Sequence, residues 1–303
     1  MRIEQTEPRR IIAQLCLLLG YSRQAYYQGI KAVQREILES EIITQEVLRI
    51  RQSQKEVGAR KLLQMMKGFF ESHKIEMSRD SFFDLLRFNG LLIRYRKRNK
   101  PQTTWSRHWF KKHPNLIKEF IPTGPNQLWV SDITYIVADG KFVYLSLITD
   151  AYSRKIVGFY LSKDLSAKGC LNALAMALRN NPERDKLIHH SDRGAQYCGN
   201  DYVEMLLKDT VRISMTQSGD PLENAIAERV NGILKRELLE NSYTNFEIAQ
   251  KGITAAISIY NYQRLHMSID LLTPAQAHHL KGDIKRKWKN YYKQREEAPV
   301  VTN

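Results

Sequence analysis

The sequence predicts an α/β fold with a mixed sheet, preceded by an all-helical region. Residues 128–161 contain three strand-like runs separated by turn residues, which is typical of an antiparallel meander. Beyond residue 166, helical and strand-like segments alternate, as they do where further strands join a sheet through helical connections. Before residue 93 the apolar residues recur at helical spacing. The helical region therefore comes first in the chain, and the sheet follows it.

Residues 1–45 are predicted to form an N-terminal helical segment. Within it, residues 9–28 indicate a short helix, a break at Gly20 and a second helix capped by Ser22. A longer helical pattern of apolar and polar residues follows over residues 31–52.

Residues 46–100 are predicted to form a helix-turn-helix DNA-binding domain. An amphipathic helix is expected over residues 59–70. Ser78 is a suitable N-cap and Gly90 a suitable C-cap for a helix over residues 79–89. Two short helices, with the second capped in this way, fit a helix-turn-helix, and a plain helical bundle is the alternative.

Residues 101–123 are predicted to form a basic linker, in a basic run that begins before it. Lys and Arg residues alternate here with Tyr95, Trp105 and Trp109, and no acidic residue occurs between residue 94 and Glu119. A solvated linker is the default interpretation, but basic residues mixed with aromatic ones suit phosphate contact and base stacking. We expect the basic run to contact DNA through Arg94, Arg96, Lys97, Arg98 and Lys100, and Arg79 of the preceding helix to contact it as well.

Residues 124–282 are predicted to form the catalytic core, and residues 283–303 a basic tail. The expected strands cover residues 128–137, 142–149, 155–161, 187–189 and 211–214. Asp139 and Gly140 form a strong hairpin-turn signal between the first two strands. The expected helices cover residues 167–179, 200–207, 224–240 and 246–263.

The overall charge favours a polyanionic partner. Lys and Arg total 47 against 32 Asp and Glu, giving a net charge of +15. Such an excess attracts nucleic acid, with an acidic membrane surface as the competing partner. No run of about 18 apolar residues occurs, so we expect no membrane partner. The three cysteines are sparse and far apart, which predicts reduced thiols, no zinc site and a cytoplasmic protein. With DNA as its partner, we expect the protein to be associated with the nucleoid.

Three acidic residues occupy positions where carboxylates serve chemistry. Asp132 lies in the middle of an apolar strand, where an aspartate is unfavourable unless it is paired or binds a metal. Asp192 follows a strand directly, at the edge where α/β sheets form their sites. Glu228 lies on a later helix that could face both. Because acids are common in soluble proteins, their positions rather than their number carry the prediction.

Convergence of these acids would create a metal site. Clustered carboxylates repel one another unless divalent cations neutralise them, and hard oxygen ligands select Mg²⁺ or Mn²⁺. Two such ions can activate an attacking oxygen and stabilise a leaving one, which is the chemistry of phosphodiester cleavage. We therefore predict that Asp132, Asp192 and Glu228 are catalytic residues and ligands of two metal ions.

Helical spacing places Glu228, Asn231 and Lys235 on one face. Asn231 and Lys235 are expected to touch phosphate there, and the adjacent Arg229 to contact DNA. Glu223 is the rival acid, but it lies near the helix start, where a capping role is favoured.

Two histidine pairs are less informative. The pair at 189–190 adjoins Asp192 and could touch substrate or the metal shell, or pack under the sheet. The pair at 278–279 is expected at the surface.

At these positions the chain resembles the transposases of the family named after insertion sequence 3, specifically the product of its second reading frame (OrfB). More distantly, it resembles retroviral integrases. The matching stretches are Leu128–Ile136, Thr149–Gly158, His190–Tyr197, Asn224–Ala225 with Glu228, and Leu234–Lys235. The resemblance covers nearly the whole chain. Two departures occur, because Glu223 stands where the family commonly has Asp and Arg229 where it commonly has a small Ser.

The resemblance implies a ribonuclease-H-like core with a mixed five-stranded sheet and the three acids as metal ligands. It implies nicking at the 3′ ends of an insertion sequence, followed by strand transfer into target DNA. The implied partners are the terminal inverted repeats, a homo-oligomer on DNA, and the first-reading-frame product as a fusion or partner. A DNA-binding regulator and a nuclease without strand transfer are the alternative functions.

Overall fold

The structure is a computed structural model that describes residues 7–93, 109–182, 186–217 and 221–285. The chain divides into two compact units. The first comprises residues 1–52 and 58–93, and the second comprises residues 53–57 and 94–303. No helix within the described ranges is long and apolar enough to cross a membrane.

The first unit is helical, as predicted. Its elements are α1 (Glu7–Leu18), α2 (Arg23–Ser53), α3 (Ala59–Met65), α4 (Lys67–His73) and α5 (Arg79–Phe88). The break at Gly20 is confirmed, with φ at +72°. The two helices predicted for residues 22–28 and 31–52 are instead one continuous helix, because the single Gly29 costs a helix only about 1 kcal/mol. The position where the sequence predicts a domain boundary, residues 45–46, lies inside this helix.

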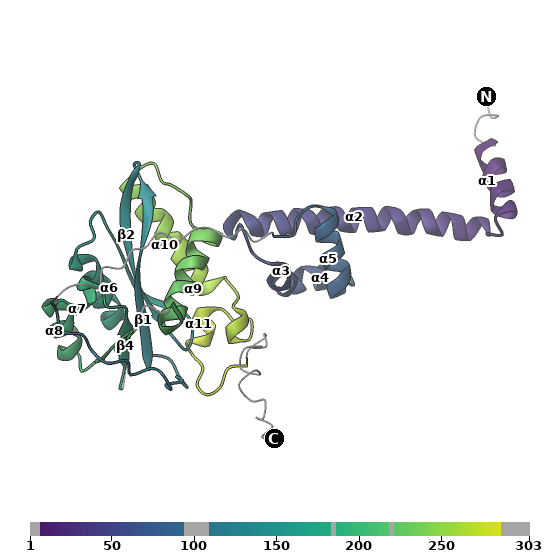
Figure 1. The fold of residues 1–303 in the computed structure, drawn as a ribbon. Coiled ribbons are helices and arrows are strands. Elements are labelled where there is room, and N and C mark those ends of the chain that lie inside the picture. Colours follow the sequence, from purple (N-terminus) through teal and green to yellow (C-terminus); the bar gives the residue numbers. More distant parts are fainter. Residues whose placement is uncertain (1–6, 94–108, 183–185, 218–220, 286–303) are drawn as a thin grey trace, which may run out of the picture. The chain divides into compact units, whose positions relative to one another are not determined.

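The core of the first unit uses only the C-terminal half of α2. Ile43, Val47 and Ile50 are buried there. The helices α3, α4 and α5 lie beside this half of α2 (Figure 1). Phe82 and Leu86 of α5 are also fully buried. By contrast, every residue of α2 from position 23 to 38 is exposed.

The caps of α5 are confirmed, but the helix predicted over residues 59–70 is divided. The Ser78 hydroxyl accepts a hydrogen bond from the Ser81 amide at 3.1 Å, and Gly90 has φ at +66°. Met66 separates α3 from α4 with φ −86° and ψ 0°. Because Met66 is fully buried, the helical spacing of apolar residues continues through the break and does not reveal it. The DNA-binding role of this region stays a prediction.

The second unit is built on a mixed five-stranded sheet, which confirms the predicted α/β class and ribonuclease-H-like arrangement. The strands are β1 (Leu128–Ala138), β2 (Lys141–Asp150), β3 (Ile156–Ser162), β4 (Ile188–Ser191) and β5 (Arg212–Met215). Their order in the sheet is β3-β2-β1-β4-β5. β1, β2 and β3 form the antiparallel meander, whereas β4 and β5 run parallel to β1. Asp139 and Gly140 both have positive φ, as a two-residue hairpin turn requires.

Helices cover both faces of the sheet. They are α6 (Ala167–Asn180), α7 (Ala195–Cys198), α8 (Asn200–Lys208), α9 (Ala225–Ile233), α10 (Phe246–Tyr262) and α11 (Pro274–Ala277), with short turns η1 (Pro221–Asn224) and η3 (Met267–Ile269). Ile148 packs with α6 and α8 in one apolar cluster, and its neighbour Leu147 packs with α9 and α10 in another. This alternation along β2 follows from the pleat of a strand with two covered faces.

The helix predicted over residues 224–240 changes geometry near its end. α9 passes directly into the π-helical turn η2 (Leu234–Leu238), which closes with a hydrogen bond from the Leu239 amide to the Leu234 carbonyl at 2.8 Å. A π-helical turn inside a helix often accompanies a functional site.

Candidate active site

The register of β1 and β4 brings two of the predicted acids to the same place. Val130 of β1 lies beside His190 of β4 in a parallel pairing. Two residues further along each strand direction lie Asp132 in β1 and Asp192, which comes just after the last residue of β4. Because parallel strands advance at the same rate, the two aspartates are neighbours across the end of β4.

The pKa of Asp132 is consistent with this proximity. Burial raises the pKa of Asp132 to about 7, and the negative charge of Asp192 adds to the effect. The charge of Glu228 raises this pKa as well, by a smaller amount, while hydrogen bonds from Asn231 and the Ile133 amide lower it. The carboxyl groups of Asp132, Asp192 and Glu228 are therefore close enough to interact electrostatically.

The helical face predicted from spacing is directed at β1. The Asn231 amide nitrogen donates to Asp132 Oδ2 at 2.7 Å. The Lys235 ammonium lies 3.8 Å from the centre of the Tyr135 ring. Burial lowers the pKa of Lys235, and the charge of Asp132 opposes that shift. At the start of the same helix, Asn224 donates to the Ser131 carbonyl at 2.9 Å and fixes α9 against the strand.

The Asp192 carboxylate is held by the turn that follows it. Its Oδ1 accepts from the Gly194 amide at 3.0 Å, an arrangement in which an aspartate side chain mimics a backbone turn. A Cβ at position 194 would lie 3.0 Å from the same oxygen, so a glycine suits this position. Gly194 was not among the predicted site residues, although the stretch Asp192-Arg193-Gly194 contains a turn signal.

The described residues do not form a closed metal cage. Across these segments, no three His, Cys, Asp or Glu side chains lie close enough to hold one ion.

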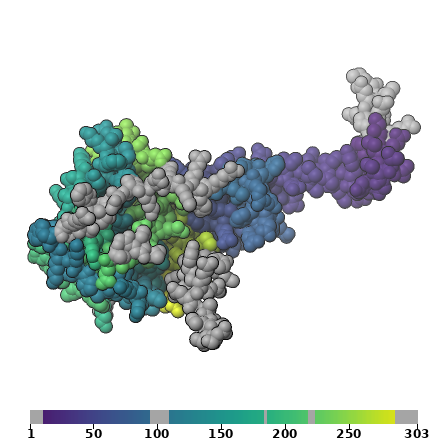
Figure 2. Space-filling model, in the orientation of Figure 1, coloured from purple at the N-terminus to yellow at the C-terminus, as the bar shows by residue number. Residues whose placement is uncertain are grey.

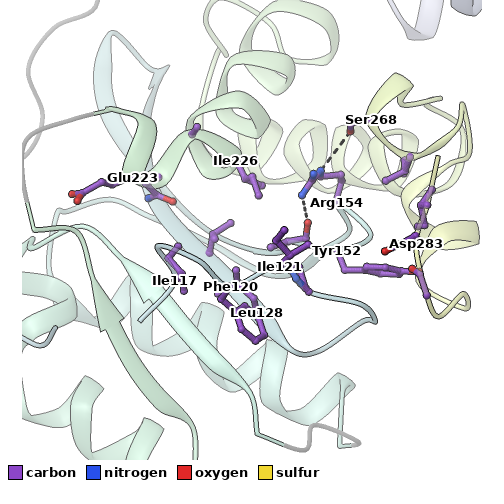
Figure 3. Close-up of a pocket in the computed structure, with 18 residues that line it drawn as sticks. Ile117, Phe120, Ile121, Leu128, Tyr152, Arg154, Glu223, Ile226, Ser268 and Asp283 are labelled. Carbon is purple, nitrogen blue, oxygen red and sulfur yellow. Dashed lines mark hydrogen bonds between the residues drawn. The ribbon is translucent and has the colours of Figure 1, made fainter. Parts of the chain in front are cut away.

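Glu223, the rival acid, has other contacts. Its Oε2 accepts from the Gln217 amide at 2.7 Å, and its Oε1 accepts from Asn115 at 3.4 Å. It also lines a pocket of about 510 Å³ with Leu128, Arg154 and other residues, as Figure 3 shows. Arg154 there donates to Ser268 at 3.5 Å. Asp132, Asp192 and Glu228 are not among the lining residues, so this pocket is separate from the acids.

His189 and His190 pack inside the core beneath the strand ends. His189 Nε2 lies 2.6 Å from the Ser131 hydroxyl and 2.9 Å from the Tyr202 hydroxyl. His190 Nδ1 lies 2.8 Å from the Ser214 hydroxyl. Burial lowers the pKa of His189 to about 3 and that of His190 to about 4. Both imidazoles are therefore neutral at physiological pH and support the sheet.

The prediction that both His278 and His279 lie at the surface was wrong for His278. Its Nδ1 lies 2.9 Å from the Ser153 hydroxyl, and its side chain is only 9% exposed. The buried Asp150 carboxylate accepts from the amide and hydroxyl of Ser153, so His278 closes a polar cluster. The pairing with a distant serine has no sequence signal.

We expect His189 to make the catalytic core sensitive to acid. Its folded pKa lies below the usual value near 6.5, so the unfolded chain binds the proton more readily. The stability that neutral His189 contributes is therefore fully present above about pH 6.5 and is lost as the pH falls toward 3. The loss amounts to about 2 kcal/mol at pH 5. Urea unfolding at pH 7 and pH 5 should show a smaller loss for His189→Gln than for the wild type. The exposed control His279→Gln should behave like the wild type, and equal losses in all three proteins would contradict this prediction.

The predicted DNA-contacting residues are only partly described. Arg229 is exposed on α9, and Arg79 is exposed at the start of α5, where it pairs with Asp80 at 2.8 Å. Arg94, Arg96, Lys97, Arg98 and Lys100 lie outside the described residues. Their DNA contacts stay predictions.

Comparison with known proteins gives the family. Profiles described as integrase core domain match residues 122–221 and 209–274. The "Insertion element IS600 uncharacterized 31 kDa protein" of Shigella sonnei is 32% identical over 275 residues, covering 86% of this chain and 96% of the relative. The "Transposase InsF for insertion sequence IS3A" of Escherichia coli is 32% identical over 194 residues, covering 63% of this chain and 67% of the relative.

The chain belongs to the insertion sequence 3 family of transposases. This confirms the predicted resemblance and makes the protein a polynucleotidyl transferase of the integrase type that acts in DNA transposition. Among solved structures, the transposase is similar to the HTLV-2 integrase catalytic core domain in complex with magnesium. That similarity has a TM-score of 0.43 and 19% identity, and it covers 52% of the transposase and all of the integrase domain.

Proposed function

We propose that the transposase nicks DNA at the 3′ ends of its insertion sequence and transfers the freed ends to target DNA, using Asp132, Asp192 and Glu228. The observation that carries this proposal is the parallel pairing of β1 with β4, which makes Asp132 and Asp192 neighbours, together with the 2.7 Å hydrogen bond that Asn231 of α9 donates to Asp132. An aspartate held inside a strand beside other negative charges destabilises the folded protein, so its presence there points to a function.

The donor set fits divalent metal ions. The three carboxylates supply hard oxygen ligands. They also repel one another, and a bound Mg²⁺ or Mn²⁺ would neutralise their negative charge. Asp132, Asp192 and Glu228 would hold two such ions. When bound, these ions supply activation of the attacking oxygen and stabilisation of the leaving one.

The proposed reaction has two displacements at phosphorus. First, a water oxygen bonds to phosphorus at the element end, and the bond from phosphorus to the 3′ oxygen breaks, leaving a 3′ hydroxyl. That hydroxyl then attacks a phosphodiester of target DNA, and the target 3′ oxygen leaves. Asn231 holds Asp132 in one orientation through its 2.7 Å bond, and Lys235 places a positive charge on the same helical face.

The proposed partners follow from this chemistry. The terminal inverted repeats and the target are the proposed DNA substrates, and we propose that Arg229 and Lys235 contact the DNA near the cut. Two element ends must be held together, so we propose a homo-oligomer on DNA. The first-reading-frame product is the proposed fusion partner or binding partner.

Two glutamates five positions apart provide a matched test. Glu228→Gln should abolish magnesium-dependent nicking of an element end and joining of a pre-cut 3′ end to a plasmid. Glu223→Gln should keep both activities within about tenfold, because Glu223 bonds Gln217 and Asn115 instead. Equal activity of the two variants would exclude Glu228 from the site. Nicking without joining by the wild type would identify a nuclease.

Asn231→Ala separates positioning from DNA contact. The variant frees Asp132 Oδ2, so nicking should fall about 10- to 100-fold, as when a residue orienting a metal ligand is removed. DNA affinity, measured by anisotropy in EDTA, should be unchanged, because Asn231 is only 7% exposed. A loss of affinity that matches the loss of rate would instead support the phosphate contact predicted from the sequence.

A further inference from the structure

The N-terminal half of α2 exposes an apolar stripe. Its members are Tyr26, Tyr27, Ile30, Val33, Ile37 and Leu38, and their exposed fractions are 42%, 44%, 37%, 56%, 62% and 60% respectively. Figure 2 shows this part of α2 uncovered on the visible face, in purple. Contiguous apolar surface of this kind marks an interaction site in soluble proteins.

The spacing within the stripe is that of a helix-pairing seam. Tyr26, Ile30, Val33 and Ile37 follow one another in steps of four, three and four residues. This is the a/d repeat with which two helices pack side chains between each other. The stripe differs from the face that α2 already uses, because Ile43, Val47 and Ile50 lie roughly a quarter turn away on the helix.

We propose that this stripe pairs with the same stripe of a second copy of the chain, with the two helices antiparallel. A surface that repeats the same kind of apolar side chain along one line is complementary to itself when related by a two-fold axis. In this arrangement Tyr26 of one copy lies level with Ile37 of the other, and Ile30 lies level with Val33.

The charges beside the stripe select the antiparallel orientation. With Ile30 and Ile37 at a positions, Glu36 takes a g position and Glu41 the following e position. Parallel helices would place Glu36 of each copy beside Glu41 of the other, giving two like-charge contacts that disfavour that arrangement. Antiparallel helices keep these glutamates apart.

The available area suffices for a specific but modest interface. At these exposed fractions, the stripe without Leu38, which takes a b position outside the seam, presents roughly 500 Å² per copy, so two copies would bury about 1,000 Å², the lower limit for specific interfaces. Leu17 and Leu18 of α1 are 85% and 81% exposed and can extend the contact. We therefore expect a dimer that dissociates on dilution.

Sedimentation of the full chain without DNA tests the pairing. The wild type should shift from monomer to dimer with concentration, and Ile30→Glu combined with Ile37→Glu should weaken the dimer at least tenfold, or about 1.4 kcal/mol. Gln28→Glu combined with Arg35→Glu, on the opposite face of α2, is the control and should still dimerise. A wild type that stays monomeric, or an unchanged dimer in the stripe variant, would overturn the proposal.

Cysteine crosslinking tests the orientation. The natural cysteines are buried, so they give little background. A mixture of Tyr26→Cys and Ile37→Cys chains should form a mixed disulfide dimer, whereas Tyr26→Cys alone should not crosslink. Crosslinking of Tyr26→Cys with itself would show parallel helices instead. Thermal unfolding checks that each variant is folded. Because α2 lies outside the catalytic core, Asp132→Asn should dimerise normally, so failure of the active-site proposal would leave this result unaffected.

Discussion

Asp132→Asn should abolish magnesium-dependent nicking while DNA binding persists. The substitution keeps the shape of the side chain but removes the negative charge of Asp132, which interacts with the charges of Asp192 and Glu228. Loss of several kcal/mol of transition-state stabilisation corresponds to a rate decrease of about 10³-fold or more. The measurement is single-turnover nicking of a labelled element end, with DNA affinity measured in EDTA.

The same substitution should stabilise the metal-free protein at high pH. Because the folded pKa of Asp132, about 7, exceeds its ordinary value of 3.8, the folded state holds the proton more tightly than the unfolded state. Stability therefore falls as the pH rises from about 4 to 7, and at pH 8 the wild type bears a cost of about 4 kcal/mol that Asp132→Asn lacks.

A second aspartate in the same hairpin provides the control for both measurements. Asp139 is exposed at the β1–β2 turn with φ at +53°, a conformation that asparagine also tolerates. Asp139→Asn should leave the nicking rate and the pH dependence of thermal unfolding unchanged. If Asp132→Asn nicked DNA at the wild-type rate, the proposed mechanism would be wrong.

Arg264→Ala should destabilise the catalytic core by about 3–5 kcal/mol. Arg264 donates from Nε and Nη2 to the two carboxylate oxygens of Glu237, at 2.7 and 2.8 Å. The two side chains are only 5% and 12% exposed, so removing the guanidinium leaves a buried carboxylate without its charge partner. Urea unfolding of the wild type and the variant at neutral pH measures the effect.

A double substitution distinguishes the loss of the ion-pair attraction from the cost of leaving Glu237 buried and charged. Arg264→Met with Glu237→Leu removes both charges and keeps apolar volume, so it should recover most of the lost stability. Arg264→Ala with a cost below about 1 kcal/mol would show that water reaches this pair and screens it.

Local signals sufficed for most of the secondary structure. The Asp139-Gly140 turn fixed the hairpin between β1 and β2, and the Ser78 and Gly90 caps fixed the ends of α5. The extent of α2 and the geometry of η2 were harder to predict from the sequence. A single Gly29 does not end a helix, and a π-helical turn keeps the apolar pattern of an α-helix.

The long-range contacts of the candidate site were harder to predict from the sequence than its residues. The sequence identified Asp132 as an aspartate in an apolar strand, but its distance from Asp192 depends on the register of β1 against β4. Similarly, helical spacing gave the face that holds Asn231 and Lys235, yet not that Asn231 bonds Asp132. The burial of His278 against Ser153 depends on residues more than a hundred positions away.

The pairing of Val130 with His190 also sets where this protein can change in length. A single extra residue between His190 and Asp192 would turn the Asp192 side chain to the opposite side of the sheet, as any one-residue slip in a strand does. A residue added at the exposed tip of the β1–β2 hairpin would leave both aspartates in place. Tags and fluorescent labels therefore belong at residues 139–140, and never within residues 188–192.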